Sequence, residues 1–135
     1  MEARHTQLLP EERKLWDAFL RLYGREWDRY EYRVLVGPAR PVLPGTAPEF
    51  RRMVEEVSRK RIDVIGWKGS EPTIFEVKPF AGSTALGQLL AYRSLWAQDH
   101  HWEGKIGLAV VTNDVHPADR EVFERFGVRI FLVPL

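Results

Sequence analysis

Three ionisable residues stand in two otherwise apolar segments near the middle of the sequence. Asp63 lies inside the segment IDVIGW, and Glu76 and Lys78 end the segment TIFEVK. A charged group among apolar neighbours costs free energy unless it is paired or has a function. Side chains alternate between the two faces of a strand, so Glu76 and Lys78 leave the same face about 6.6 Å apart.

The three residues could together handle a metal ion and a phosphate. If a hairpin brings Asp63 near Glu76, two carboxylates converge with the ammonium of Lys78 beside them. Mg²⁺ prefers such oxygen ligands, completed by a backbone carbonyl and water. The ion lowers the pKa of a bound water and shields the charge that builds on a phosphate. Lys78 would hold the attacking water or neutralise the pentavalent phosphorane.

Two further polar residues, Gln88 and Tyr92, follow in the segment ALGQLLAYRSLW. Their spacing of four places them one above the other on a helix. An amide among apolar neighbours needs a polar partner, which a carboxylate or a phosphate would supply. Taken singly, each candidate is more often a solvated or capping side chain, and Glu76 with Lys78 is more often a weak surface ion pair. The combination favours a functional site.

Hydrophobic periodicity predicts the elements that position these residues. The order is helix, strand, helix, strand, strand, helix, strand, helix, strand, which indicates an α/β protein with a mixed central sheet flanked by helices. The chain of 135 residues suits a single domain over 1–135. The expected helices are 10–23, 49–58, 83–97 and 117–126, and the expected strands are 30–36, 61–67, 73–78, 106–112 and 128–133.

Three of these elements matter for the arguments below. The turn-like residues 68–72 predict a hairpin between the Asp63 strand and the Glu76 strand. The helix at 49–58 carries an apolar face. The final strand, 128–133, could pair across a subunit edge or lie in the interior of its own sheet. The apolar face of the second helix comprises Phe50, Met53, Val54 and Val57.

The pattern "IDV…FEVK…GQLLAY", within residues 58–96, resembles the PD-(D/E)XK nuclease superfamily and, within it, the RecB-like branch. The resemblance implies a restriction-endonuclease-like core and a nuclease dependent on Mg²⁺ or Mn²⁺ that acts on DNA. Asp63, Glu76 and the Val77 carbonyl would bind the metal, and Lys78 would be the catalytic lysine. Gln88 and Tyr92 would orient the site or contact DNA. The sequence departs from the pattern at residue 62, where isoleucine replaces the proline that names the superfamily.

RecB-like enzymes often have a further acidic residue or histidine upstream of the site. The sequence offers several acidic candidates and does not distinguish among them. These candidates are Glu11, Glu12, Asp17, Glu55 and Glu56.

Basic residues cluster on both sides of Asp63 and could form a phosphate-binding rim. The formal net charge is only +1, so DNA binding must rest on such a local patch. Simple solvation of these side chains is an equally good interpretation. The candidates for contact with nucleic acid are Arg61, Lys68 and Arg93, with Arg51, Arg52, Arg59 and Lys60 nearby in the sequence.

The absence of cysteine excludes disulfides, thiol catalysis and cysteine-ligated zinc, and with them the iron–sulfur variants of the RecB-like branch. It suits a protein of a reducing compartment, so a cytoplasmic location is expected, either in a host cytoplasm or in a virion if the gene belongs to a phage. No segment is apolar enough to predict a membrane helix, so no membrane partner is expected.

Two alternatives to a free-standing nuclease remain open. The first is a nuclease-fold structural or adaptor protein of the phage head-completion, neck or transposition type, with weak or no catalysis. The second is a subunit that forms the nuclease site only within a homo-oligomer or a larger nucleoprotein or virion complex. The small size and balanced charge favour the first alternative, and retention of every motif residue favours the enzyme.

Overall fold

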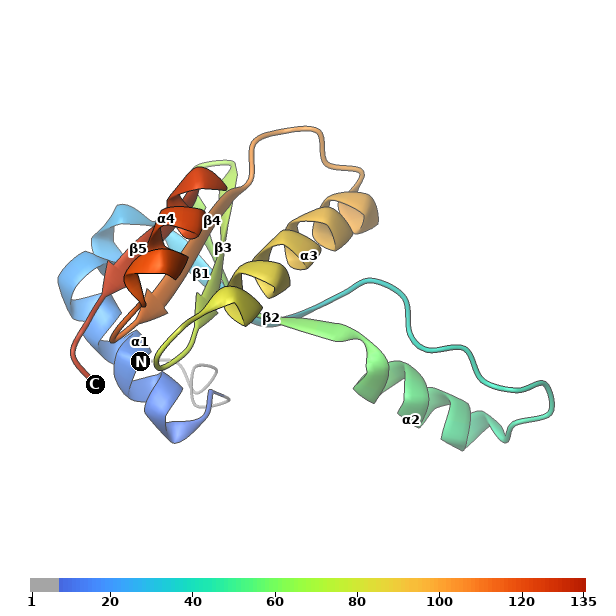
Figure 1. Cartoon of the computed structure of the whole chain (residues 1–135). Helices are drawn as coiled ribbons and strands as arrows, with labels where there is room; N and C mark the ends of the chain where they lie inside the picture. The colour runs from blue at the N-terminus through green and yellow to red at the C-terminus, as the bar shows by residue number, and fades with distance from the viewer. Residues whose placement is uncertain (1–7) are drawn as a thin grey trace.

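The computed structural model describes residues 8–135, and its elements follow the predicted order (Figure 1). One short 3₁₀ helix, η2, is added after the first helix. The helices are α1 (Pro10–Tyr23), η2 (Gly24–Glu26), α2 (Pro48–Ser58), α3 (Ser83–His100) and α4 (Pro117–Arg125). The strands are β1 (Arg29–Val36), β2 (Lys60–Lys68), β3 (Glu71–Val77), β4 (Gly107–Thr112) and β5 (Val128–Leu132).

The five strands form one mixed sheet in the order β1-β2-β3-β4-β5. The pairs β1–β2 and β2–β3 are antiparallel, whereas β3–β4 and β4–β5 are parallel. The parallel pairs are joined through α3 and α4, as crossover connections require. The α/β class and the mixed sheet are therefore confirmed. β5 is an edge strand, so of the two alternatives for the final strand, the interior position is wrong.

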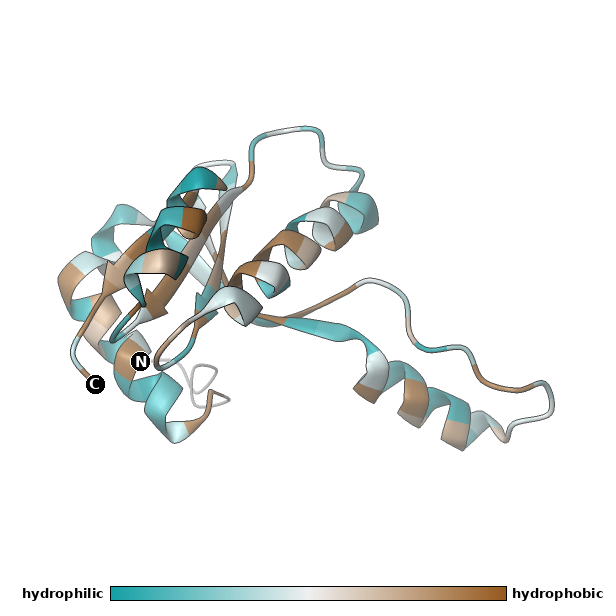
Figure 2. Ribbon diagram, in the orientation of Figure 1, coloured by the Kyte–Doolittle hydropathy of each residue, from teal (hydrophilic) through white to brown (hydrophobic). Residues whose placement is uncertain are grey.

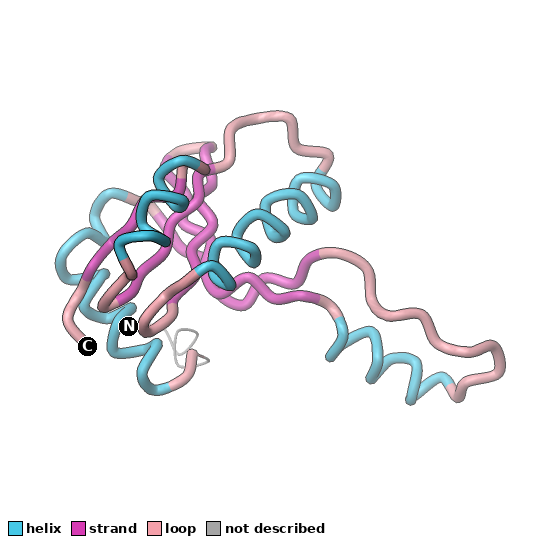
Figure 3. Tube along the Cα trace, viewed as in Figure 1, coloured by secondary structure: helices cyan, strands magenta, loops and turns pink. Residues whose placement is uncertain are grey.

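Helices cover both faces of the sheet, with α1 on one face and α3 and α4 on the other (Figures 1 and 3). Trp16 and Phe19 of α1 pack against Phe75 of β3. On the opposite face, Ile74 of β3 packs in a cluster with Leu89 of α3. Because side chains alternate along β3, Glu76 shares the face of Ile74 and points toward α3.

A tight turn sets the register of the β2–β3 hairpin. Lys68 pairs with Glu71, so the turn contains only Gly69 and Ser70. The φ angle of Gly69 is +59°, a left-handed conformation that glycine adopts without steric cost. The predicted hairpin is confirmed, although β3 begins earlier than predicted and ends at Val77 rather than at Lys78.

The segment between β1 and β2 extends away from the rest of the fold (Figure 1). β1 and β2 stay paired as far as Val36 and Lys60, whereas the β2–β3 ladder ends at Val64 and Phe75. β1 and β2 therefore extend beyond the rest of the sheet as a two-stranded ribbon, and α2 lies at the far end of this ribbon. No residue of α2 is buried, so nothing in the described structure covers its predicted apolar face.

Within residues 8–135, no helix is both long enough and apolar enough to cross a membrane.

Candidate active site

Asp63 and Glu76 lie opposite each other on neighbouring strands. The last β2–β3 pair is Val64 with Phe75, and one step further along the same register places Asp63 across from Glu76. The two strands diverge at this point, and the Asp63 carboxylate accepts a hydrogen bond from the Val77 N–H at 3.0 Å. The side chain thus replaces the backbone carbonyl that a continuing ladder would supply.

The strand on the other side of Asp63 has an irregular backbone. Tyr32 pairs with Val64 and Val34 pairs with Ile62, and Arg33 lies between them. The φ angle of Arg33, 55°, is left-handed, which is uncommon for a residue other than glycine. Asp63 therefore lies between the end of the β2–β3 ladder and an irregular residue of β1.

Glu76 is buried, with 5% of its surface exposed, and its Oε1 atom has no hydrogen-bond partner. Burial, followed by the charge of Asp63, raises the pKa of Glu76 to about 9. Burial also raises the pKa of Asp63 to about 6, although the hydrogen bond from Val77 acts in the opposite direction. Between these pH values the pair holds one proton, because two adjacent buried carboxylates do not both ionise.

Tyr92 of α3 lies near this pair, and Gln88 lies one helical turn before it on the same side of α3. The Gln88 Oε1 atom is buried without a hydrogen-bond partner. Tyr92 is buried, and its pKa is raised above the usual value by that burial and then by the charges of Glu76 and Asp63. The structure therefore places Tyr92 near the carboxylates, and an association of Gln88 with them stays a prediction.

Lys78 lies one residue beyond the end of β3, with an exposed side chain. Its N–H donates to the Val111 carbonyl at 3.0 Å, which ties its backbone to β4. Its charge lowers the pKa values of both Asp63 and Glu76, against the larger effect of burial. The ammonium is therefore close enough to act on the two carboxyl groups while remaining open to solvent.

Among the upstream acidic candidates, Glu12 is the one whose charge raises the pKa values of both Asp63 and Glu76. It lies in the first turn of α1, which the fold brings to this end of the sheet. A cavity of about 320 Å³ lies beside it, lined by Leu9, Pro10, Glu11, Glu12 and Pro79. Glu55 and Glu56 lie on α2 instead, away from the sheet (Figure 1). The sequence had no signal that separates these candidates, because the choice depends on where α1 docks.

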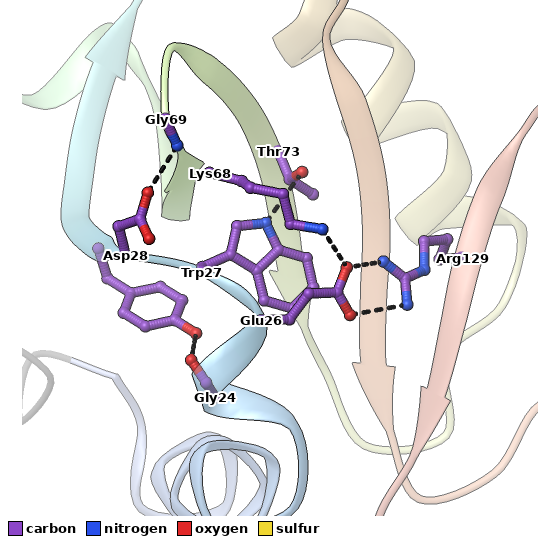
Figure 4. Close-up of polar contacts among 9 residues, drawn as sticks. Gly24, Glu26, Trp27, Asp28, Lys68, Gly69, Thr73 and Arg129 are labelled. Carbon is purple, nitrogen blue, oxygen red and sulfur yellow. Dashed lines mark hydrogen bonds and ion pairs between the residues drawn. The ribbon is translucent and has the colours of Figure 1, made fainter.

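Lys68 lies away from this site, so it does not form one rim around the carboxylates with Arg61 and Arg93, and a contact of Lys68 with nucleic acid stays a prediction. It stands at the hairpin turn, five residues along β2 from Asp63, a distance of about 16 Å in an extended strand. Its ammonium is 3.5 Å from Glu26. Figure 4 shows Glu26 held also by Arg129 from the edge strand β5. The charges around Lys68 thus form a separate network at the opposite end of the sheet.

The other two basic candidates lie nearer the carboxylates. Arg61 is two residues before Asp63 on β2, and its guanidinium donates to the Glu56 carbonyl at 3.0 Å. Arg93 follows Tyr92 on α3 and is half-buried. A phosphate contact by Arg61 or by Arg93 stays a prediction.

The mixed five-stranded sheet in the order β1-β2-β3-β4-β5, with helices on both faces, has the α/β architecture of the restriction-endonuclease-like fold. The structure of EndoMS in complex with double-stranded DNA matches it with a TM-score of 0.52 at 14% identity, over 95% of this chain and 47% of that chain. A repair endonuclease from Pyrococcus abyssi matches with a TM-score of 0.49 at 15% identity, over 98% of this chain and 46% of that chain.

These similarities concern the fold alone, because the identities are low. The chain spans about half the length of either endonuclease. No known protein family matches the sequence, and no curated protein matches it.

Proposed function

We propose that the protein is a metal-dependent nuclease that hydrolyses phosphodiester bonds in DNA, with Asp63 and Glu76 as its metal-binding carboxylates. The observation that carries the proposal is the buried Glu76 carboxyl, which opposes Asp63 and leaves Oε1 without a hydrogen-bond partner. Such a pair is costly in a folded protein when both groups are ionised, unless a cation offsets the charge. The nuclease fold of EndoMS and its DNA complex are consistent with this assignment.

The donor set suits Mg²⁺ or Mn²⁺. Both ions favour oxygen ligands and keep several waters. The described part of the chain has no cluster of three acidic or histidine side chains arranged to hold a metal, so a main-chain ligand is needed. The N–H and C=O groups of one strand residue point toward the same neighbour. Because the Val77 N–H points to Asp63, its carbonyl is directed to the same side and is our third ligand.

The remaining site residues then have distinct tasks. A bound divalent ion would lower the pKa of a coordinated water and offset charge on the phosphate. The Lys78 ammonium would hold the attacking water or stabilise the negative charge of the transition state. Gln88 supplies an unpaired amide oxygen that would orient a water or a carboxylate. The Tyr92 hydroxyl would support the carboxylates from α3. These roles are those of the RecB-like pattern.

Glu12 would act on the same pair from the start of α1, either directly or through a water. We expect Glu12→Gln to weaken Mn²⁺ binding about tenfold, because a neighbouring negative charge favours a bound cation. Glu11→Gln is the matched control, since Glu11 is the exposed neighbour in the same turn. Isothermal titration calorimetry with Mn²⁺ compares the two variants with the wild-type chain. Equal weakening of Mn²⁺ binding in both variants would show that Glu12 is not part of the site.

The experiment that tests the function combines metal binding with cleavage. The purified chain is titrated with Mg²⁺ and Mn²⁺ by calorimetry and then incubated with linear, nicked and single-stranded DNA. We expect one metal site that Asp63→Asn abolishes, and cleavage that EDTA stops. Cleavage that persists in EDTA would contradict the proposal.

A structural or adaptor role is the second candidate, and one observation favours it. Among residues 8–135, no third acidic or histidine side chain joins Asp63 and Glu76 in a metal-binding cluster, so the set of protein ligands is small. A scaffold of this kind would bind neither ion in the calorimetric titration and would leave all DNA substrates intact. Metal binding without cleavage would instead favour a subunit completed by a partner.

A further inference from the structure

The helix α2 is amphipathic, and its apolar side faces away from the rest of the fold (Figure 2). Three of its apolar side chains are largely exposed: Phe50 at 54%, Met53 at 47% and Val57 at 64%. Their spacing of three and four places them in one stripe, and Val54 extends it. Within the described structure, this apolar stripe of α2 is not part of the hydrophobic core. It is therefore available to a partner.

The charges of α2 are arranged symmetrically about its centre. The sequence from residue 50 to residue 57 is FRRMVEEV, with two arginines before the midpoint and two glutamates after it. Reversing the direction of the helix therefore exchanges arginine with glutamate and apolar with apolar. We propose that α2 pairs antiparallel with α2 of a second copy of this chain, about a two-fold axis between Met53 and Val54.

Helical geometry supports this pairing on both sides of the stripe. At 100° per residue, Arg51 and Glu55 lie on one flank of the apolar stripe, and Arg52 and Glu56 lie on the other. An isologous antiparallel pair brings the same flank of each copy together. Arg51 then lies at nearly the same level along the helix axis as Glu55 of the second copy, and Arg52 at nearly the same level as Glu56 of the second copy. Because Glu55 and Arg52 are about 150° from the centre of the stripe, the opposite charges attract across the pair without direct contact.

A parallel pair has the opposite electrostatic result. A two-fold axis along the helices brings unlike flanks together, so arginine meets arginine and glutamate meets glutamate. Like charges in that position oppose association. The charge pattern thus favours the antiparallel orientation, with a second copy of the same chain as the partner.

The four charged side chains are available for this contact. The salt bridges of the described residues use other side chains than Arg51, Arg52, Glu55 and Glu56. The helix lies away from the sheet at the end of the β1–β2 ribbon (Figure 1). With 11 residues, about 16 Å of helix, the contact is smaller than an obligate interface. We therefore expect a reversible dimer with a micromolar dissociation constant.

Sedimentation equilibrium across a range of concentrations measures the dimer. We expect the double variant Arg51→Glu with Arg52→Glu, and the double variant Glu55→Arg with Glu56→Arg, each to raise the dissociation constant about tenfold or more. An equimolar mixture of the two variants should recover wild-type affinity, because opposite charges again meet. Arg120→Glu with Arg125→Glu on α4 is the control and should leave the dimer unchanged.

The absence of native cysteine allows a direct test of orientation. In the antiparallel pair, residue 50 of one copy lies opposite residue 57 of the other. Phe50→Cys chains mixed with Val57→Cys chains should therefore form a mixed disulfide in oxidising buffer. Phe50→Cys alone should not cross-link to itself, since its two copies are about 10 Å apart along the axis.

Any of three results would overturn the proposal. These are a monomer at all concentrations, a dimer that the charge variants do not weaken, and efficient self-cross-linking of Phe50→Cys. A dimer insensitive to α2 would point to the β5 edge instead. Circular dichroism confirms that each variant folds, which is expected because α2 buries none of its residues. The proposal is independent of catalysis, so its failure leaves the nuclease assignment unaffected.

Discussion

Lys78→Ala and Asp63→Ala should each reduce DNA cleavage by about 100-fold or more while the fold is retained. Asp63 would lose the carboxylate that opposes Glu76 and accepts the Val77 N–H. Lys78 would lose the ammonium that acts on water or on transition-state charge, a type of interaction worth about 10²–10³ in rate. Initial rates on the preferred DNA substrate, measured in saturating Mn²⁺, give the comparison.

Lys68→Ala is the matched control for the lysine variant. Lys68 lies at the far end of β2 and contacts Glu26, so its loss should leave the cleavage rate within about twofold of wild type. A measurement on protein free of host nuclease is essential. Undiminished cleavage by both alanine variants would refute the assignment of the site.

The second large effect concerns Glu76→Gln and the pH dependence of stability. The raised pKa of Glu76, about 9 against an ordinary value of 4.5, means that the folded chain binds this proton more tightly than the unfolded chain. The resulting stability is fully present below about pH 4.5 and is lost as the pH rises toward 9. In EDTA, the free energy of unfolding of the wild type should therefore fall by about 2–4 kcal/mol between pH 5 and pH 8.

Glu76→Gln removes the titrating group but keeps its shape, so most of this decrease should disappear. Mg²⁺ should stabilise the wild type more at pH 8 than at pH 5, because the ion favours the ionised pair. The variant should lose that response. Glu103→Gln, an exposed glutamate in the loop after α3, is the control. Chemical denaturation at several pH values measures these effects, and identical pH profiles for wild type and Glu76→Gln would contradict the account.

The part of the site that sequence could predict is the part fixed by local geometry. Alternation along β3 and a hairpin at 68–72 predict that Asp63 and Glu76 come close together, and the two-residue turn of the structure then fixes the register that opposes them. Helical spacing likewise fixes Gln88 above Tyr92. These relations depend on neighbours in the sequence, so they do not require the tertiary structure.

The choice of Glu12 and the position of Lys68 depended on tertiary structure. Glu12 reaches the pair because α1 docks on the sheet with its first turn at this end, which local periodicity does not specify. Lys68 is close to Asp63 in the sequence, yet an extended strand separates them by about 16 Å. The apolar face of α2 was predictable as a pattern, but its exposure was not, because periodicity shows which side is apolar and not what covers it.

The most direct test of the central claim is a crystal structure of the chain grown in Mn²⁺, with anomalous diffraction data. The account predicts one anomalous peak within bonding distance of a carboxylate oxygen of Asp63 and a carboxylate oxygen of Glu76, with the Val77 carbonyl also directed at it. A fully ordered site at saturating Mn²⁺ with no peak between those two residues would contradict it.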